Sequence, residues 1–201
     1  MGVCMETKNS NLLNFEEGKF LVNLARRSIE HTLKKGTLLD IKPQEVTSAN
    51  LVRRGASFVT LYNQDGMLRG CIGSLEPTRV LVFDVLENAV RAAFRDPRFP
   101  PVTPFEFRTI KITVSVLTLP EPFPVNSAED LLSKLKPKKH GLIIQKGFAR
   151  ATFLPAVWEE LQNKEAFLAE LCVKAGLEPD EWKNTKEMEF FVYEEQEFSD
   201  S

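Results

Sequence analysis

The chain has 201 residues, 43% of them hydrophobic and 27% charged, which is typical of a folded globular protein and argues against disorder. Its net charge of -2 argues against the basic surface that nucleic acid or an anionic membrane requires, and no apolar run approaches the ~20 residues of a membrane span. The three cysteines, Cys4, Cys71 and Cys172, are far apart and suggest no disulfide framework, so we expect a cytoplasmic protein with free thiols.

The first part of the chain is predicted to form a helix, a hairpin and a second helix. A capping box at Asn14 and a stop at Gly36 bound the first helix. Segments 57–62 and 67–74 flank a turn cluster that ends in glycine, and this pattern predicts the hairpin. Thr78 is the expected cap of the second helix.

Proline-rich connections separate the elements that follow. Residues 96–104 end the second helix and form a stiff, extended segment. Strict alternation over 109–118 predicts a half-buried strand, and 119–125 is a candidate boundary between substructures. After this boundary we expect a helix from Ser127, a hairpin of 142–145 with 148–153, helices from Pro155 and Lys164, and a strand over 187–193. Hairpins without a βαβ rhythm predict an α+β fold, with a mainly antiparallel sheet flanked by helices.

The most unusual stretch is residues 67–74, Met-Leu-Arg-Gly-Cys-Ile-Gly-Ser. Alternation along a strand puts Arg69, Cys71 and Gly73 on one face. A neighbouring cation favours the thiolate, which is the reactive form of cysteine. Gly70 and Gly73 mark a place where another backbone or a ligand approaches closely. A free cysteine is usually a small buried hydrophobe, however, so a packing role for Cys71 stays open at this point.

Three further residues are candidates for the site. Arg98 and Phe99 lie in the stiff proline-rich segment and are placed to line a groove, although a structural strap over the core is an equal alternative. His140 lies at a loop-to-strand junction, where functional side chains often occur, and is the candidate base if the fold brings it to Cys71. Two histidines and scattered thiols make a zinc site unexpected, and the sequence identifies no cofactor.

Several blocks of the sequence resemble the AMMECR domain family, and they occur in the same order. They are Leu-Arg-Gly-Cys-Ile-Gly-Ser at 68–74, Asp-Pro-Arg-Phe-Pro-Pro at 96–101, Val-Ser-Val-Leu-Thr at 114–118 and Ala-Arg-Ala-Thr-Phe-Leu-Pro-Ala-Val-Trp at 149–158. Residues 167–182 resemble the prokaryotic members, which are also called AmmeMemoRadiSam system protein A. The resemblance extends over nearly the whole chain.

This resemblance implies a two-lobed α+β fold with a cleft between a larger and a smaller part. We therefore expect a single AMMECR-like domain over residues 12–195, with 1–11 and 196–201 as loose termini. The resemblance also implies that Arg69, Gly70, Cys71 and Gly73 belong to the family's hexapeptide motif, a suspected active or binding site. It further implies association with a radical-SAM protein and a Memo-like protein, but it supplies no established reaction.

Two functions are consistent with these observations. In the first, the protein is a cysteine-dependent enzyme or a subunit of an enzyme complex, with Cys71 and His140 as catalytic residues. The predicted substrate contacts are Arg69, Gly70, Gly73, Arg98 and Phe99. In the second, the protein is a non-catalytic binding module whose cleft holds a peptide, a nucleotide or a partner's loop. The sequence identifies neither a substrate nor an oligomeric state.

Overall fold

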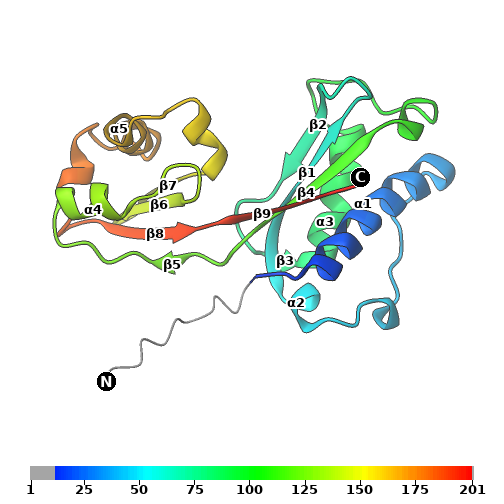
Figure 1. Cartoon of the computed structure of the whole chain (residues 1–201), viewed down its shortest axis with the longest axis horizontal. Coiled ribbons are helices and arrows are strands. Elements are labelled where there is room, and N and C mark those ends of the chain that lie inside the picture. The colour runs from blue at the N-terminus through cyan, green and yellow to red at the C-terminus, as the bar shows by residue number, and fades with distance from the viewer. Residues whose placement is uncertain (1–11, 201) are drawn as a thin grey trace. The chain divides into compact units, whose positions relative to one another are not determined.

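A computed structural model describes residues 12–200, and the chain forms two compact units, each with its own hydrophobic core (Figure 1). The chain leaves the first unit after Thr118, at the proline-rich connector, and returns to it at Gln196. The second unit is Leu119–Glu195. The predicted loose N-terminus, residues 1–11, lies outside the described part of the chain, as does Cys4.

The first unit is a five-stranded sheet packed against helices. Its strands are β1 (Arg54–Tyr62), β2 (Leu68–Gly73), β3 (Arg79–Val80), β4 (Lys111–Leu117) and β9 (Glu195–Ser199). The order is β2-β1-β4-β9, with β3 also paired to β1, and β1 runs antiparallel to β2, β3 and β4. The helices are α1 (Phe15–Lys35), α2 (Ala49–Val52) and α3 (Leu81–Phe94).

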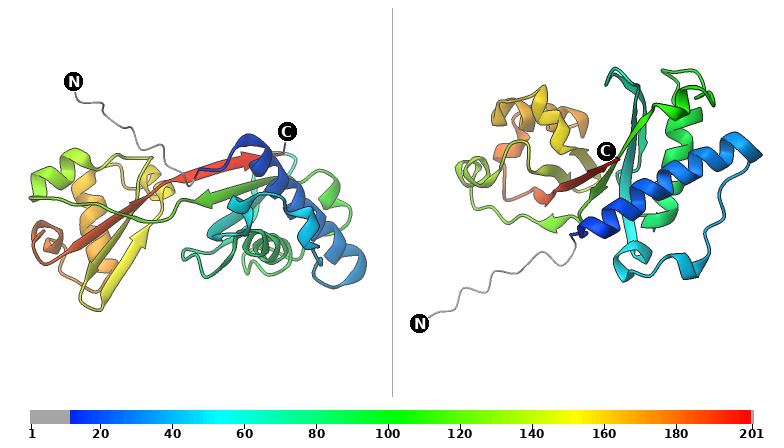
Figure 2. Two further views of the ribbon diagram at one scale, coloured as in Figure 1. Left: turned by 90° about the horizontal axis from the view of Figure 1, so that it is seen from below. Right: turned by 45° about the vertical axis from the view of Figure 1, so that its right-hand side comes forward.

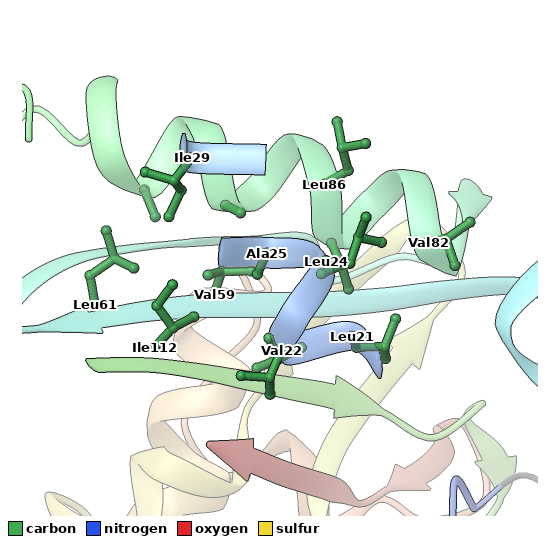
Figure 3. Close-up of a cluster of buried hydrophobic side chains, with 14 of the residues drawn as sticks. Leu21, Val22, Leu24, Ala25, Ile29, Val59, Leu61, Val82, Leu86 and Ile112 are labelled. Atoms are coloured by element: carbon green, nitrogen blue, oxygen red, sulfur yellow. The ribbon is translucent and has the colours of Figure 1, made fainter. Parts of the chain in front are cut away.

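The core of this unit lies between α1, α3 and one face of the sheet. Figure 3 shows Leu24 and Ile29 of α1 with Leu86 of α3, close to Val59 of β1 and Ile112 of β4. The alternation predicted for residues 109–118 explains this arrangement, because every second side chain of β4 faces the helices. The α+β prediction is confirmed.

The ends of α1 follow the predicted signals. Asn14 Oδ1 accepts a hydrogen bond from the Glu17 N–H at 2.9 Å, and Glu17 Oε2 accepts one from the Asn14 N–H at 2.7 Å. This capping box satisfies two N–H groups at the start of the helix. Gly36 ends the helix in the left-handed conformation, at φ 71°. The predicted first helix is therefore confirmed. Although α1 is the longest helix described, charged residues occur all along it, and none of the helices of residues 12–200 qualifies as a membrane span.

The second unit has a four-stranded sheet in the order β5-β8-β6-β7. The strands are β5 (Glu121–Pro122), β6 (Gly141–Lys146), β7 (Ala149–Phe153) and β8 (Glu189–Tyr193), and the helices are α4 (Ala128–Lys134) and α5 (Lys164–Lys174). Single turns of 3₁₀ helix lie at Pro43–Glu45, Glu106–Arg108, Pro155–Glu159 and Glu181–Lys183. The rings of Trp158 and Phe167 stack at 3.7 Å in the core, where Cys172 is also buried.

Three expectations differ from the structure. The strand expected to be half-buried, β4, is buried on both faces, because it lies inside the sheet between β1 and β9 and its Thr113 and Ser115 are buried as well as its aliphatic residues. The second helix begins at Leu81 rather than at Thr78, because Arg79 and Val80 pair with β1 as a short strand. The C-terminal segment from residue 196, expected to be loose, belongs to the first sheet as β9. Its attachment depends on distant partners: Asp200 Oδ1 accepts a hydrogen bond from the Ile112 N–H at 2.7 Å.

Candidate active site around Cys71

Cys71 lies in β2, at one edge of the first sheet, and is half-buried. It is directly opposite Thr60 of β1, which is in turn opposite Thr113 of β4. Thr60 Oγ1 donates a hydrogen bond to the Cys71 sulfur at 3.3 Å. The Cys71 N–H donates to Asp96 Oδ2 at 2.8 Å. Both the thiol and the backbone of this residue therefore have defined partners.

Asp96 connects Cys71 to Arg98. The Asp96 side chain is only 2% exposed, and it accepts hydrogen bonds from Arg98 Nη2 at 2.7 Å and Nε at 3.0 Å. These bonds hold the pKa of Asp96 far below its usual value, so the carboxyl group is ionised. In return, the hydrogen bond to Asp96 raises the pKa of Arg98, and the Cys71 thiol adds to this shift. Arg98 Nη2 also donates to the Cys71 carbonyl oxygen at 3.3 Å.

Arg69, the cation expected beside the thiol, has other partners. Its Nε donates to Glu106 Oε1 at 2.9 Å, and its Nη2 donates to the Pro100 carbonyl oxygen at 2.9 Å. The Arg69 guanidinium lowers the pKa of Glu106 to about 2. Arg69 Nη1 is buried and has no hydrogen-bond partner among the described residues. Strand alternation predicted the position of Arg69 but not its pairing with a carboxylate 37 positions away.

Phe99 lies close to both guanidinium groups. The centroid of its ring is 5.5 Å from the guanidinium carbon of Arg98 and 5.8 Å from that of Arg69. At these distances the ring face attracts a cation. The proline-rich segment thus contributes an aromatic ring and a cation near β2. That these side chains line a groove and contact a substrate stays a prediction.

The two glycines of the motif are explained by close packing within the first unit. A Cβ atom added at Gly70 would lie 2.3 Å from the Ala92 carbonyl oxygen of α3. One added at Gly73 would lie 2.2 Å from the ring of Phe58. The close approach predicted at these positions is therefore made by this chain's own atoms. As substrate contacts, the two glycines stay predictions.

His140 lies in the second unit, directly before β6. Its Nδ1 accepts a hydrogen bond from the Lys136 N–H at 3.3 Å, and its carbonyl oxygen accepts one from Trp158 Nε1 at 2.8 Å. Burial lowers the pKa of His140, although the charge of Glu194 opposes this shift. The predicted site residues that the first unit brings together are Arg69, Gly70, Cys71, Gly73, Arg98 and Phe99, whereas His140 is described only by its contacts in the second unit.

A buried polar network lies behind the motif, and it was not identified from the sequence. Asp84 Oδ2 accepts hydrogen bonds from the Ser57 N–H at 2.9 Å and hydroxyl at 2.7 Å, and Oδ1 accepts one from the Ser74 hydroxyl at 2.8 Å. Asn88 Nδ2 donates to Asp84 Oδ2 at 3.0 Å. The available signal was a pair of polar residues spaced four apart in an apolar helix. The network fixes α3 to β1 and to the end of β2.

Metal-ligand geometry is not found in this part of the chain. Within residues 12–200, no three His, Cys, Asp or Glu side chains are grouped as ligands of a metal ion. The other described cysteine, Cys172, is fully buried, and burial raises the pKa of its thiol. Cys172 therefore behaves as a small core hydrophobe.

Fold and site together define an α+β protein that holds a cysteine on an edge strand, next to a buried aspartate and its paired arginine. The chain belongs to the AMMECR1 family, whose model matches residues 22–198. The family predicted from the sequence blocks is therefore confirmed.

Several relatives from archaea are similar over most of their length. Protein MK0488 of Methanopyrus kandleri is 40% identical over 195 residues, which cover 94% of this chain and 90% of the relative. Protein MJ0810 of Methanocaldococcus jannaschii is 44% identical over 174 residues, which cover 85% of this chain and 84% of the relative. The crystal structure of the uncharacterized protein PH0010 from Pyrococcus horikoshii aligns with a TM-score of 0.73 and 37% identity, covering 94% of each chain.

Proposed function

We propose that this protein is a cysteine-dependent enzyme, or the cysteine-bearing subunit of an enzyme complex, with Cys71 as its nucleophile. One observation carries the proposal: the Cys71 thiol accepts a hydrogen bond from Thr60, and the Arg98 guanidinium lies at the same residue, donating to its carbonyl oxygen at 3.3 Å. A hydrogen-bond donor and a cation are the features that stabilise a reactive thiolate. Cys172, by contrast, lies in an apolar core.

Arg98 has a second role in this proposal. Its side chain is 53% exposed, yet two hydrogen bonds to the buried Asp96 hold the guanidinium in place. A preorganised cation of this kind stabilises negative charge without reorganisation during the reaction. We therefore propose that Arg98 also binds an anionic group of the substrate, with Arg69, Gly70, Gly73 and Phe99 as further contacts.

In the proposed step, the Cys71 thiol proton passes to a base and the sulfur electron pair forms a bond to an electrophilic carbonyl carbon, while the C=O π-bond breaks and its electron pair moves to the oxygen, where Arg98 can stabilise the negative charge. His140 remains the candidate base that the sequence suggested, because imidazole is the side chain that most often takes up a proton near neutral pH. The family resemblance is the ground for proposing a radical-SAM protein and a Memo-like protein as partners. Cys71 and Cys172 are free thiols, which suits a reducing cytoplasm.

The alternative is a non-catalytic binding module, in a cleft that holds a peptide, a nucleotide or a partner's loop. The observation that favours it is the cluster of Arg69, Arg98 and Phe99, which would recognise an anionic group without any reaction at Cys71. A Cys71→Ser variant separates the two functions. An enzyme loses its cellular activity with this change, whereas a binding module keeps both partner binding and activity.

Alkylation by iodoacetamide tests the catalytic proposal without knowledge of the substrate. The native protein is treated between about pH 5 and 9, and modification of each cysteine is followed by peptide mass spectrometry. We expect Cys71 to react faster than a small-molecule thiol at neutral pH, while Cys172 is protected. If Cys71 reacts no faster than the small-molecule thiol, or is protected at every pH, nucleophilic catalysis loses its support.

A further inference from the structure

The edge of the first sheet opposite β2 is formed by β9, and no described strand pairs with its outer side. The backbone of an edge strand presents N–H and C=O groups that pair readily with another extended chain. Most of β9 is polar: its sequence is Glu-Gln-Glu-Phe-Ser, and its one apolar residue is Phe198. This edge lies on the opposite side of the sheet from Cys71, and it is acidic and polar apart from Phe198.

A hollow of about 720 Å³ lies along this edge, between α1 and β9. Its apolar lining comes from Phe15, Val22 and Phe198, and the side chain of Phe15 is left without cover, since this residue is 74% exposed. α1 runs alongside β9 here (Figure 2), and Gly18 permits the approach: a Cβ atom at Gly18 would lie 2.0 Å from the Phe198 ring. An extended chain paired with β9 would direct every second side chain into this hollow.

The other face of β9 is acidic. Glu195 and Glu197 occupy the positions of the strand that alternate with Phe198, and Glu197 also borders the hollow, whose lining includes Lys19 and Arg26. Glu197 is exposed and has no ion pair among the described residues. A second copy of β9 in this position would set carboxylates against carboxylates, which is unfavourable across a strand pair. A strand with lysine or arginine at alternate positions would instead complement Glu195 and Glu197.

We propose that β9 and the α1 hollow bind an extended segment of a partner protein in which basic and apolar residues alternate. The segment adds to the sheet as a further strand, through backbone hydrogen bonds to β9. Its basic side chains face Glu195 and Glu197. Its apolar side chains enter the hollow against Phe15, Val22 and Phe198.

The test uses the full chain and a fluorescent heptapeptide, acetyl-Lys-Val-Lys-Leu-Lys-Val-Lys-amide, in an anisotropy titration. A peptide of the same composition with the lysines in one block keeps the charge but loses the alternation. We expect saturable binding of the alternating peptide, much weaker binding of the block peptide, and a loss of affinity with added salt. Glu197→Lys should weaken binding about tenfold or more. Phe15→Ser should also weaken peptide binding, because the hollow loses an apolar side chain. Glu189→Lys, at an exposed position of β8, should leave peptide binding unchanged.

Three results would overturn the proposal. The alternating peptide fails to bind, the block peptide binds equally well, or Glu197→Lys binds the alternating peptide as tightly as the unmodified chain. Circular dichroism of each variant shows that a loss of binding is not a loss of folding. Sedimentation of the free chain tests the other occupant: a dimer that the peptide dissociates would mean that β9 pairs with a second copy, against the charge argument.

Discussion

Replacing Asp96 by asparagine changes the charge of the group that links Cys71 to Arg98 and leaves its shape nearly unchanged. The carboxylate accepts from the Cys71 N–H and from Arg98 Nη2 at Oδ2, and from the Arg98 N–H and Nε at Oδ1. An asparagine side chain has one acceptor oxygen and one NH₂ donor. One of these two sets of donors must therefore face another donor in the variant.

The structure sets the size of the expected effect. Hydrogen bonds to a charged group contribute about 1.5–3 kcal/mol each, and removal of one member of a fully buried ion pair costs about 3–5 kcal/mol. Arg98 is half-exposed and can be rehydrated, whereas the Cys71 N–H cannot turn away from its acceptor. We therefore expect Asp96→Asn to lower the free energy of unfolding of the first unit by about 2–3 kcal/mol.

The pH dependence has a defined sign. Arg98 lowers the pKa of Asp96 in the folded protein, so the contribution of this carboxylate is complete above its unfolded pKa of 3.8 and is lost as the pH falls below that value. Asp96→Asn should lack this component of acid destabilisation, so the difference in stability between the variant and the unmodified protein should shrink as the pH falls.

Hydrogen exchange of peptides from β2 measures this directly, because the acceptor of the Cys71 N–H is no longer charged in the variant and its hydrogen bond is weaker. Urea unfolding followed by far-ultraviolet circular dichroism gives the free energy. Tryptophan fluorescence is an internal check, since Trp158 and Trp182 both lie in the second unit. Asp65→Asn, in the exposed turn before β2, is the matched control and should change stability by less than about 0.5 kcal/mol. If Asp96→Asn matches this control in both measurements, the positioning role assigned to Asp96 is refuted.

Three other substitutions test the packing and the electrostatics of the site. Gly70→Ala should lower the melting temperature more than Gly73→Ala. The new methyl group meets a backbone oxygen of α3 at position 70 but a rotatable phenyl ring at position 73. Equal decreases in melting temperature for the two variants would contradict this reasoning. Glu106→Gln should remove the stability that the Glu106–Arg69 ion pair contributes, about 1 kcal/mol after allowance for the 38% exposure of the Glu106 side chain. The unmodified protein should lose this contribution between about pH 4.5 and 2, because the pKa of Glu106 is lowered to about 2 in the folded state. If the free energy of unfolding of the variant depends on pH in this range as it does in the unmodified protein, the ion pair does not contribute. Thr60→Val should slow alkylation of Cys71 at neutral pH about two- to fivefold, and an unchanged rate would show that the hydroxyl does not act on the sulfur.

Much of the fold was predictable because its signals are local. The caps of α1 at Asn14 and Gly36 depend on residues within one helical turn, and the hairpin of β1 with β2 depends on a turn cluster between two apolar strands. β9 gave no such signal, because an acidic strand with one apolar residue resembles a solvated tail. The C-terminal segment is held by the Arg26 side chain of α1 and by the backbone of β4, which both bind Asp200 and are distant in the sequence.

The site was predicted in part for the same reason. Strand alternation identifies the face of β2 that carries Cys71, but it cannot choose between two arginines as the cation at the thiol. That choice depends on carboxylates that are distant in sequence: Asp96 is 25 positions from Cys71, and Glu106 is 37 from Arg69. Each carboxylate pairs with the arginine that the fold brings closest to it, Asp96 with Arg98 and Glu106 with Arg69. These pairings can be read only from the folded chain.

The most direct test of the central claim is the alkylation rate of Cys71 in an Arg98→Met variant, with Arg91→Met on the exposed face of α3 as the matched control. Met has a similar length and no charge. We predict that Arg98→Met slows the reaction with iodoacetamide several-fold near pH 7, because the cation beside Cys71 is removed. The Arg91→Met protein should react like the unmodified one. Equal rates for all three proteins at neutral pH would contradict the claim that Arg98 activates Cys71.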